Sequence, residues 1–333
     1  MERAGVEDPD GRAVVRSLQA AVEAIVEPAF LVGGSVRDLL MGRSCGDYDF
    51  ATSRTPDEVE EAVRAAGRRP YLTGKRFGTV GFKVAGHTVE VTTFRAETYP
   101  DASRRPEVRY LDDLGDDLAR RDFTINAMAL HGDALIDPHG GRTDIAARIV
   151  RAVGDPSARF AEDPLRLLRA ARFASQLGFE IDAATHEGMT ANAHRILSVA
   201  RERRASELDK LVTGPAAPAG LRLLAETGLL RYLLPELQPL VDSGGELWER
   251  TLAAVDAAPA EPAARWAALL GHVAVPFLGP AASSSEVRAA LGAEIADRIG
   301  LGLRWSTARR EAVREALRGR RDRRPRSGPA AVR

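Results

Sequence analysis

The secondary-structure signals of the chain change character near residue 155, and this change limits the folds that the chain can adopt. Before that point, helical patterns alternate with short apolar runs typical of strands, such as residues 29–34 and 45–52. After it the strand signals disappear, and apolar residues recur at helical spacing. The sequence therefore predicts an α/β head followed by an all-helical remainder.

Local signals place the elements of the head. Residues 12–27 have the periodicity of an amphipathic helix, and residues 55–67 read as a helix opened by Thr55 and Pro56. Two alternating runs joined by Ala85 and Gly86 predict a hairpin. Residues 96–120 are charged and aperiodic, which predicts a long mobile loop.

Composition excludes several classes of protein. The 333 residues are 44% hydrophobic and 28% charged with a formal net charge of zero, which is typical of a soluble globular protein. No apolar run is long enough to span a membrane, and the N-terminus has no secretory h-region. Cys45 is the only cysteine, so a disulfide framework and a cysteine zinc site are excluded. We expect a cytoplasmic protein of two or three domains.

The charge is uneven at the C-terminal end. Residues 304–333 carry 11 Arg against the three acids Glu311, Glu315 and Asp322, a local charge of +8. Blocks of this kind often bind nucleic acid. A solvated, partly disordered tail explains the composition equally well.

Acidic residues in two of the predicted strands suggest a metal site. On a strand, residues i and i+2 share a face, so Asp47 and Asp49 present adjacent carboxylates, which suit Mg²⁺ with substrate phosphates. Glu90 lies between two valines and must point away from them, either as a third carboxylate of the site or as a surface residue. Exposed loop acids are the alternative for the Asp pair.

The segment 31–38 combines a strand, a glycine turn and a helix start, with Ser35 as the expected cap. Such a turn presents backbone N–H groups to a phosphate, and glycine allows an anion to approach closely. Gly33 and Gly34 form the turn, and Arg37 adds a cation. The alternative is a plain tight turn. However, the acid pair follows about a dozen residues later, so a phosphate-binding turn and a metal-binding pair could face one another.

Two later segments carry further candidates. Arg120 and Arg121 supply two cations that could hold a triphosphate, and Asp122 or Asn126 could bind a ribose hydroxyl. The alternative is that Asp122 caps a helix through residues 125–130 and the two arginines are solvated. In the second segment, Asp163 is expected to cap a helix that starts at Pro164. A basic stripe follows at i+3 spacing, and its alternative is a solvated helix face: Arg166, Arg169 and Arg172.

These motifs, in this order, resemble the class II nucleotidyltransferases, a family of CCA-adding tRNA nucleotidyltransferases and bacterial poly(A) polymerases. The resemblance rests on LVGGSVRDLLMG, DYDFAT, VEVTTFR, DDLARRDFTINAMAL, LIDPHGGRTDI and EDPLRLLRAARFASQLGF, and covers residues 29–210. It implies a head of polymerase-β nucleotidyltransferase type followed by helical neck, body and tail. The expected domains are an N-terminal helix 1–28, head 29–150, neck 151–212, body 213–303 and basic tail 304–333.

The resemblance also implies roles for single residues. Asp47 and Asp49 would hold two catalytic Mg²⁺ ions. The nucleotide would contact the glycine turn and a set of polar residues: Gly33, Gly34, Arg37, Arg121, Asp122, Asp163, Arg166, Arg169 and Arg172. Within this set, Asp163 and Arg166 would read the base, and the segment 96–110 corresponds to the family's flexible loop.

The implied reaction is attack of an RNA 3′-hydroxyl on the α-phosphate of CTP or ATP, with release of pyrophosphate. The expected partners are the tRNA 3′ end, CTP and ATP, with no membrane and no obligate protein partner. The head motifs leave a poly(A) polymerase, or an enzyme that adds only A or CC, as alternatives. A catalytically inactive RNA-binding protein is the remote alternative.

Overall fold

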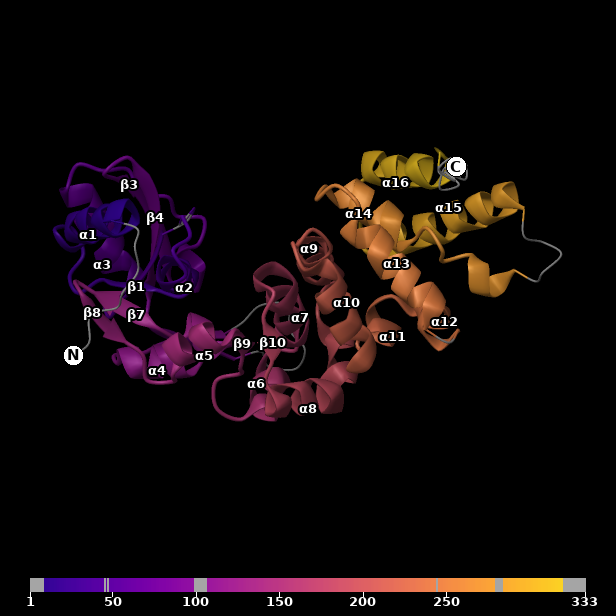
Figure 1. Cartoon of the computed structure of the whole chain (residues 1–333). Helices are drawn as coiled ribbons and strands as arrows, with labels where there is room; N and C mark the ends of the chain where they lie inside the picture. Colours follow the sequence, from indigo (N-terminus) through magenta and orange to yellow (C-terminus); the bar gives the residue numbers. More distant parts are fainter. Residues whose placement is uncertain are drawn as a thin grey trace, which may run out of the picture. The chain divides into compact units, whose positions relative to one another are not determined.

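The computed structural model describes residues 9–44, 46, 48–98, 107–243, 245–278 and 284–319. They form two compact units (Figure 1). The first unit contains residues 1–163 and 180–188, and the second contains residues 164–179 and 189–333. The boundary therefore falls inside segment 151–212, which the sequence assigned to a single neck.

A six-stranded sheet forms the centre of the first unit (Figure 1). Its spatial order is β3-β4-β2-β1-β7-β8. Strand β2 pairs parallel with β4, and the other neighbours pair antiparallel. The strands are β1 (Phe30–Val32), β2 (Tyr48–Thr52), β3 (Thr79–Val84), β4 (His87–Thr93), β7 (Ala129–His131) and β8 (Ala134–Ile136).

The hairpin predicted at Ala85 and Gly86 is present. Both residues have positive φ, 49° and 83°, as a two-residue turn between twisted strands requires. Strand β3 pairs with β4 across this turn from Thr79↔Thr92 to Val84↔His87. The turn sets the register of β4 and therefore the face on which each β4 side chain lies.

Helices cover one face of this sheet and close the main core. They are α1 (Pro9–Glu23), α2 (Gly34–Leu40) and α3 (Pro56–Ala65). The core combines their apolar side chains, such as Leu18 and Val63, with strand residues such as Phe50 and Phe82. The predicted start of α3 is confirmed, because Thr55 and Glu58 form a reciprocal capping box. Residues of α1 belong to the head core, so this helix is part of the first unit.

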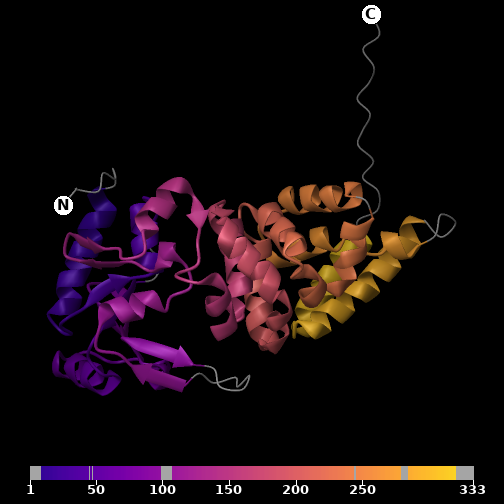
Figure 2. The same ribbon diagram turned by 90° about the horizontal axis from the view of Figure 1, so that it is seen from below.

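The long mobile loop predicted over residues 96–120 is wrong for the described part of that segment. Strands β5 (Arg95–Thr98) and β6 (Glu107–Tyr110) pair antiparallel, side by side in Figure 2, and α4 (Leu114–Ala119) follows. Strands of four residues are too short to show a period, while Asp113 caps α4 by accepting from the Asp116 N–H. Residues 99–106 of the predicted loop lie outside the described residues.

Short elements complete the first unit. They are η3 (Thr124–Asn126), α5 (Gly141–Ala147), β9 (Ile149–Val150), α6 (Pro156–Glu162) and β10 (Glu180–Ile181). The alternative helix over residues 125–130 is absent, because a single 3₁₀ turn leads into β7. Strand β10 pairs parallel with β9, so one short strand follows residue 155 where none was predicted. Two residues are too few to produce a strand pattern.

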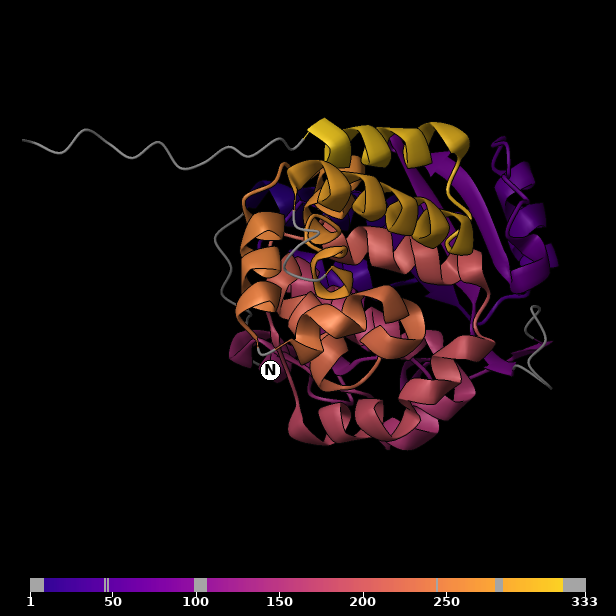
Figure 3. The same cartoon turned by 90° about the vertical axis from the view of Figure 1, so that its right-hand side faces the viewer.

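The second unit is built of helices, as predicted. Helix α8 (Ala183–Asn192) runs from the first unit into the second. The others are α7 (Leu165–Leu177), η4 (Ala193–Ser198), α9 (Arg201–Val212), α10 (Ala217–Glu226), α11 (Leu230–Leu233), η5 (Pro235–Leu237), α12 (Gln238–Asp242), α13 (Glu246–Asp256), α14 (Pro262–Leu269), η6 (Val275–Phe277), α15 (Ser285–Gly302) and α16 (Thr307–Gly319). Figure 3 shows α15 and α16 lying side by side. Within the described ranges, every helix is too short or too polar to cross a bilayer.

Part of the basic C-terminal segment is folded into the second unit. Arg309 pairs with Asp209 of α9, and its guanidinium lies 4.4 Å from the centre of the Trp305 ring. Arg310 pairs with Asp297 of α15. These arginines hold α16 in place, so a solvated tail is the wrong description for them. Residues 320–333 lie outside the described residues, and their role as a nucleic-acid contact stays a prediction.

Candidate active site

Two carboxylates lie next to each other on the sheet face opposite the main core. Tyr48 and Phe50 of β2 point into that core, so Asp49 points away from it, and Asp49 is exposed. Strand β4 repeats the pattern, because Val91 is buried and Glu90 is exposed. Asp49 and Glu90 are register partners in the parallel β2–β4 ladder. The strands therefore place both carboxylates side by side on one face.

The donor set at this position fits a hard cation. Carboxylate oxygens on a solvent-accessible face are suitable ligands for Mg²⁺ and leave positions for substrate oxygens. Asp47, the first carboxylate of the predicted pair, lies outside the described residues. Among the residues that are described, no three His, Cys, Asp or Glu side chains gather as a metal site. The role of Asp47, Asp49 and Glu90 as ligands thus stays a prediction.

The glycine turn between β1 and α2 adjoins the start of β2. Gly33 has φ 69° and donates its N–H to the Met128 carbonyl across the sheet. The prediction that Ser35 caps α2 is wrong, because Gly33 occupies the cap position. The buried Ser35 hydroxyl instead accepts the Asp49 backbone N–H at 3.2 Å. This bond ties the turn to the strand that carries the carboxylate.

Arg37 is held over the turn by partners on both sides. Its guanidinium donates to the Asp38 carboxylate at 2.9 and 3.0 Å and to Asn126 Oδ1 at 2.8 Å. Asn126 in turn donates its side-chain amide to Asp122 Oδ1 at 3.2 Å. Arg37, Asn126 and Asp122 thus form one chain of hydrogen bonds that joins the two predicted motifs. Asp122 and Asn126 are both buried.

Arg121 reaches the same turn from the other side. Its Nη1 donates to the Asn126 carbonyl at 3.4 Å and lies 2.8 Å from the point where a Cβ on Gly33 would sit. The turn residues Gly33 and Gly34 are therefore flanked by two guanidinium groups, those of Arg37 and Arg121. Backbone N–H groups with two cations are suited to bind a polyanion.

The sequence reasoning missed Asp117, a carboxylate of α4 that is 1% exposed. Its two oxygens accept from Arg120 and Arg121, at 2.7 Å and 3.0 Å to the Nη2 atoms. The signal was present as the i+3 and i+4 spacing of the two arginines on one helical turn. The charged, aperiodic sequence of residues 96–120 has no helical pattern that would place these three residues on one turn.

Substitution of Gly33 by alanine should impair triphosphate binding. The new Cβ would lie 2.8 Å from Arg121 Nη1, and the positive φ adds a backbone cost of about 1–2 kcal/mol. Gly67→Ala is the matched control, because Gly67 has φ +68° and no atom within 4 Å of the added Cβ. We expect similar losses in unfolding free energy but a roughly tenfold higher KM for nucleotide in Gly33→Ala alone. Equal KM values for the two variants would contradict this assignment.

The environment of Asp117 predicts a pH effect on stability. Burial raises the pKa of its carboxyl, but the charges of Arg121 and Arg120 and their hydrogen bonds outweigh burial and lower the pKa below its ordinary value. The folded state then binds fewer protons than the unfolded chain, so this stabilisation is complete above about pH 4 and is lost as pH falls further. Urea unfolding between pH 6 and 3 should show a weaker acid dependence in Asp117→Asn. Identical pH slopes for both proteins would contradict the expectation.

The candidates near residue 165 differ in part from their predicted environment. Asp163 ends α6 and Pro164 caps α7, so the prediction that Asp163 caps this helix is wrong. Helix α7 therefore begins at Leu165, one residue later than predicted. Arg166 and Arg169 lie on α7 and are partly exposed. The unit boundary falls between Asp163 and Pro164.

Arg172 does not belong to a solvated face. It is 9% exposed, its Nε lies 2.8 Å from Glu207 Oε2 of α9, and its guanidinium lies 4.1 Å from the centre of the Phe173 ring. Both contacts are internal to the second unit. This environment favours a supporting role for Arg172 over direct contact with a nucleotide.

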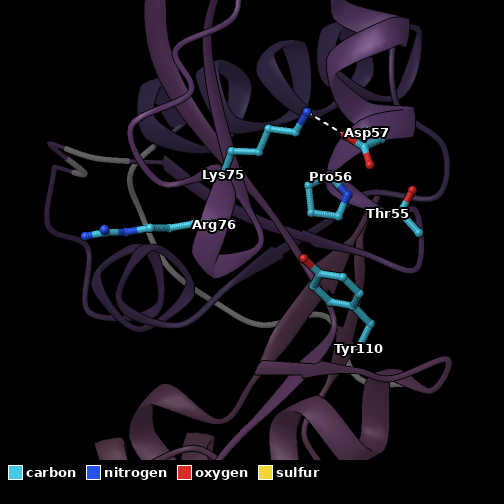
Figure 4. A pocket seen from close by; sticks show the side chains of 6 residues that line it. All are labelled: Thr55, Pro56, Asp57, Lys75, Arg76 and Tyr110. Carbon is cyan, nitrogen blue, oxygen red and sulfur yellow. Dashed lines mark ion pairs between the residues drawn. The ribbon is translucent and has the colours of Figure 1, made fainter. Parts of the chain in front are cut away.

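The first unit also has a pocket, which lies at the start of α3. Figure 4 shows its lining, which includes Lys75, Arg76 and Tyr110. Lys75 pairs with Asp57 and Glu60 of α3, so its charge is balanced within the protein. None of the predicted site residues lines this pocket, and its balanced lysine makes it a poorer phosphate site than the glycine turn.

Comparison with protein-family models gives two matches. The model of the Poly A polymerase head domain matches residues 29–151. The model of the probable RNA and SrmB-binding site of polymerase A matches residues 178–240. The first match includes Asp49, Glu90 and the glycine turn. It identifies the head as a nucleotidyltransferase domain.

Individual relatives define the family more closely. The crystal structure of the Bacillus stearothermophilus CCA-adding enzyme in complex with CTP is 30% identical, with a TM-score of 0.60, over 94% of this chain and 82% of that one. A tRNA nucleotidyltransferase complexed with a primer tRNA and an incoming ATP analogue is 25% identical, with a TM-score of 0.57, over 86% of this chain and 79% of that one. Fold and head motifs together define a class II nucleotidyltransferase. Within that class, the chain belongs to the CCA-adding enzyme family.

Sequence identity to the curated relatives is higher than to these solved structures, but the matches cover less of the relatives' own length. The CCA-adding enzyme of Geobacillus sp. is 45% identical over 235 residues, which are 66% of this chain and 57% of the relative. The CCA-adding enzyme of Bacillus velezensis is 41% identical over 260 residues, or 62% of its length. The matched part of the chain thus spans little more than half of these relatives.

Proposed function

We propose that this protein adds C, C and A in turn to the 3′ end of tRNA, using CTP and ATP and releasing pyrophosphate. Membership of the CCA-adding enzyme family supports this proposal. The observation that carries it is the arrangement in the head, where Asp49 and Glu90 share a sheet face and Ser35 links Asp49 to the glycine turn.

The residues of the head divide the work of nucleotidyl transfer. The N–H of Gly34, with Arg37 and Arg121, binds and orients the triphosphate, while the Gly33 N–H is bonded to Met128 and fixes the turn. Asp122, which Asn126 fixes through a hydrogen bond, accepts a hydrogen bond from the ribose in this proposal. Positioning and charge neutralisation of this kind provide most of the catalysis in phosphoryl transfer.

Asp47 and Asp49 would hold two Mg²⁺ ions in the proposed site, with Glu90 beside them. When bound, such ions activate the attacking hydroxyl and stabilise the leaving oxygens of an in-line displacement. The protein's own part is to keep Asp49 and Glu90 adjacent and open to solvent, which the exposed sheet face and the β2–β4 register support.

Base choice is proposed to depend on Asp163 and Arg166. A carboxylate only accepts and a guanidinium only donates hydrogen bonds. Cytosine and adenine each present an amino donor beside a ring-nitrogen acceptor, so one pair of side chains suits both. Uracil and guanine present a carbonyl and a ring N–H there, and each is left mispaired. Arg169 and Arg172, which lie with Arg166 on α7, support this pair.

Primer extension tests the proposal directly. The substrate is a tRNA transcript that ends at the discriminator base, incubated with Mg²⁺ and each NTP alone or combined. Growth by three nucleotides with CTP and ATP, followed by a stop, is the expected result. An A ladder with ATP alone indicates a poly(A) polymerase, growth by two C a CC-adding enzyme, and no growth an inactive RNA-binding protein.

A further inference from the structure

We infer that Asp117 is a positioning residue for nucleotide binding, acting through Arg121. Its buried carboxylate fixes the guanidinium of Arg121 so that Nη1 faces the Gly33–Gly34 turn. The inference rests on the proposed function, because that function assigns the triphosphate to this turn.

The carboxylate of Asp117 has a separate oxygen for each arginine. Oδ2 accepts from Arg121 Nε at 3.3 Å and Nη2 at 3.0 Å. Oδ1 accepts from Arg120 Nε at 3.1 Å and Nη2 at 2.7 Å, and also from the Arg95 backbone N–H at 3.3 Å. Five donors thus converge on one side chain that is 1% exposed. The arginines that follow α4 and the backbone of the first residue of β5 together fix the position of the Asp117 carboxylate.

This pairing determines what Arg121 presents to the site. Asp117 occupies the Nε–Nη2 edge of the guanidinium, and Nη1 extends to the Asn126 carbonyl and to the surface of Gly33. A free arginine side chain loses considerable rotamer entropy when it binds a phosphate, and an arginine already held in place loses less. Asp117 therefore prepares Arg121 before the nucleotide arrives.

The charge balance favours a functional arrangement over simple packing. Leu118, the next residue, is completely buried and provides the apolar contact of α4. Burying a carboxylate is costly, and a packed apolar side chain is often at least as stable. The trio of Asp117, Arg120 and Arg121 keeps a surplus of one positive charge, and the two arginine side chains remain 23% and 20% exposed.

The first test compares Asp117→Asn with Asp116→Asn in steady-state kinetics. Asp116 is the neighbouring residue on α4 and is exposed, so its variant controls for loss of one acidic charge. We expect Asp117→Asn to raise the KM for both CTP and ATP roughly tenfold, with kcat changed much less. A KM equal to that of Asp116→Asn overturns the inference.

A double-mutant cycle with Arg121→Ala separates positioning from general destabilisation. If Asp117 acts through Arg121, then Asp117→Asn adds no further rise in KM when Arg121 is already alanine. Additive effects of the two substitutions overturn the inference, since they mean that Asp117 acts elsewhere. Thermal unfolding of each variant identifies any loss of fold.

Arg121→Lys keeps the inference testable if Asp117→Asn does not fold. Lysine keeps the charge but cannot form the Nε–Nη2 fork with Asp117. We expect its KM to approach that of Arg121→Ala, whereas a KM near the wild-type value overturns the inference. Equilibrium binding of CTP to the wild-type protein is measured alongside. Absence of wild-type binding contradicts the proposed function and this inference with it, whereas wild-type binding with unchanged variants overturns this inference alone.

Discussion

Substitution of Asp49 by asparagine will lower the rate of nucleotide addition by at least about 10³-fold and leave the fold intact. The side chain is exposed on the sheet face opposite the core, so its loss removes no packing. We propose that its carboxylate, which lies beside Glu90 in the β2–β4 ladder, ligates Mg²⁺ next to the glycine turn. Asparagine keeps the shape but removes the charge.

Single-turnover extension of tRNA measures this effect, with circular dichroism as the check on fold. Asp133→Asn is the control, because Asp133 is an exposed carboxylate of the head whose partner is Arg16. Activity of Asp49→Asn within tenfold of that control would contradict the assignment. Glu90→Gln, measured in the same series, distinguishes a third ligand, which costs about 10²-fold, from a surface glutamate with no effect.

Substitution of Asp163 by alanine will relax the choice of base. A site built on hydrogen bonds rejects mispaired analogues by about 10⁴-fold, because the wrong partner leaves polar groups unpaired. Removing Asp163 deletes the acceptor for the amino group of cytosine and adenine, and it also removes the mismatch with uracil and guanine. We expect slower addition from CTP and ATP and a gain of addition from UTP and GTP.

The ratio of kcat/KM for CTP over UTP is the quantity to measure. Glu187→Gln is the matched control, since Glu187 is an exposed carboxylate of the same unit. We expect the ratio to fall by two orders of magnitude or more in Asp163→Ala and to stay constant in the control. Unchanged selectivity in both variants would show that base choice depends on other residues.

Much of the fold could be predicted from the sequence because its signals are local and strong. The Ala85–Gly86 hairpin, the capping box at Thr55 and the change to helices after residue 155 all depend on near neighbours. Elements that depend on tertiary contacts could not be predicted. Strands β5 and β10 are only four and two residues long and have no period of their own.

In the candidate site, too, some features have a local sequence signal and others depend on tertiary contacts. Alternation correctly indicated that Glu90 points away from Val89 and Val91, but only the strand register shows that it lies beside Asp49. The contact between Ser35 and the Asp49 N–H joins residues 14 positions apart and has no local signal. Burial of Arg172 against Glu207 likewise depends on how α7 packs on α9. Such contacts belong to the tertiary structure, which residue spacing alone does not specify.

Sequencing of the 3′ ends that the wild-type protein adds is the most direct test of the central claim. The substrate is a tRNA ending at its discriminator base, with all four NTPs present at equal concentration and Mg²⁺ as the metal. The account predicts C-C-A on nearly every extended molecule, with no further growth. Runs of A, random additions or ends that stop at C-C would contradict it.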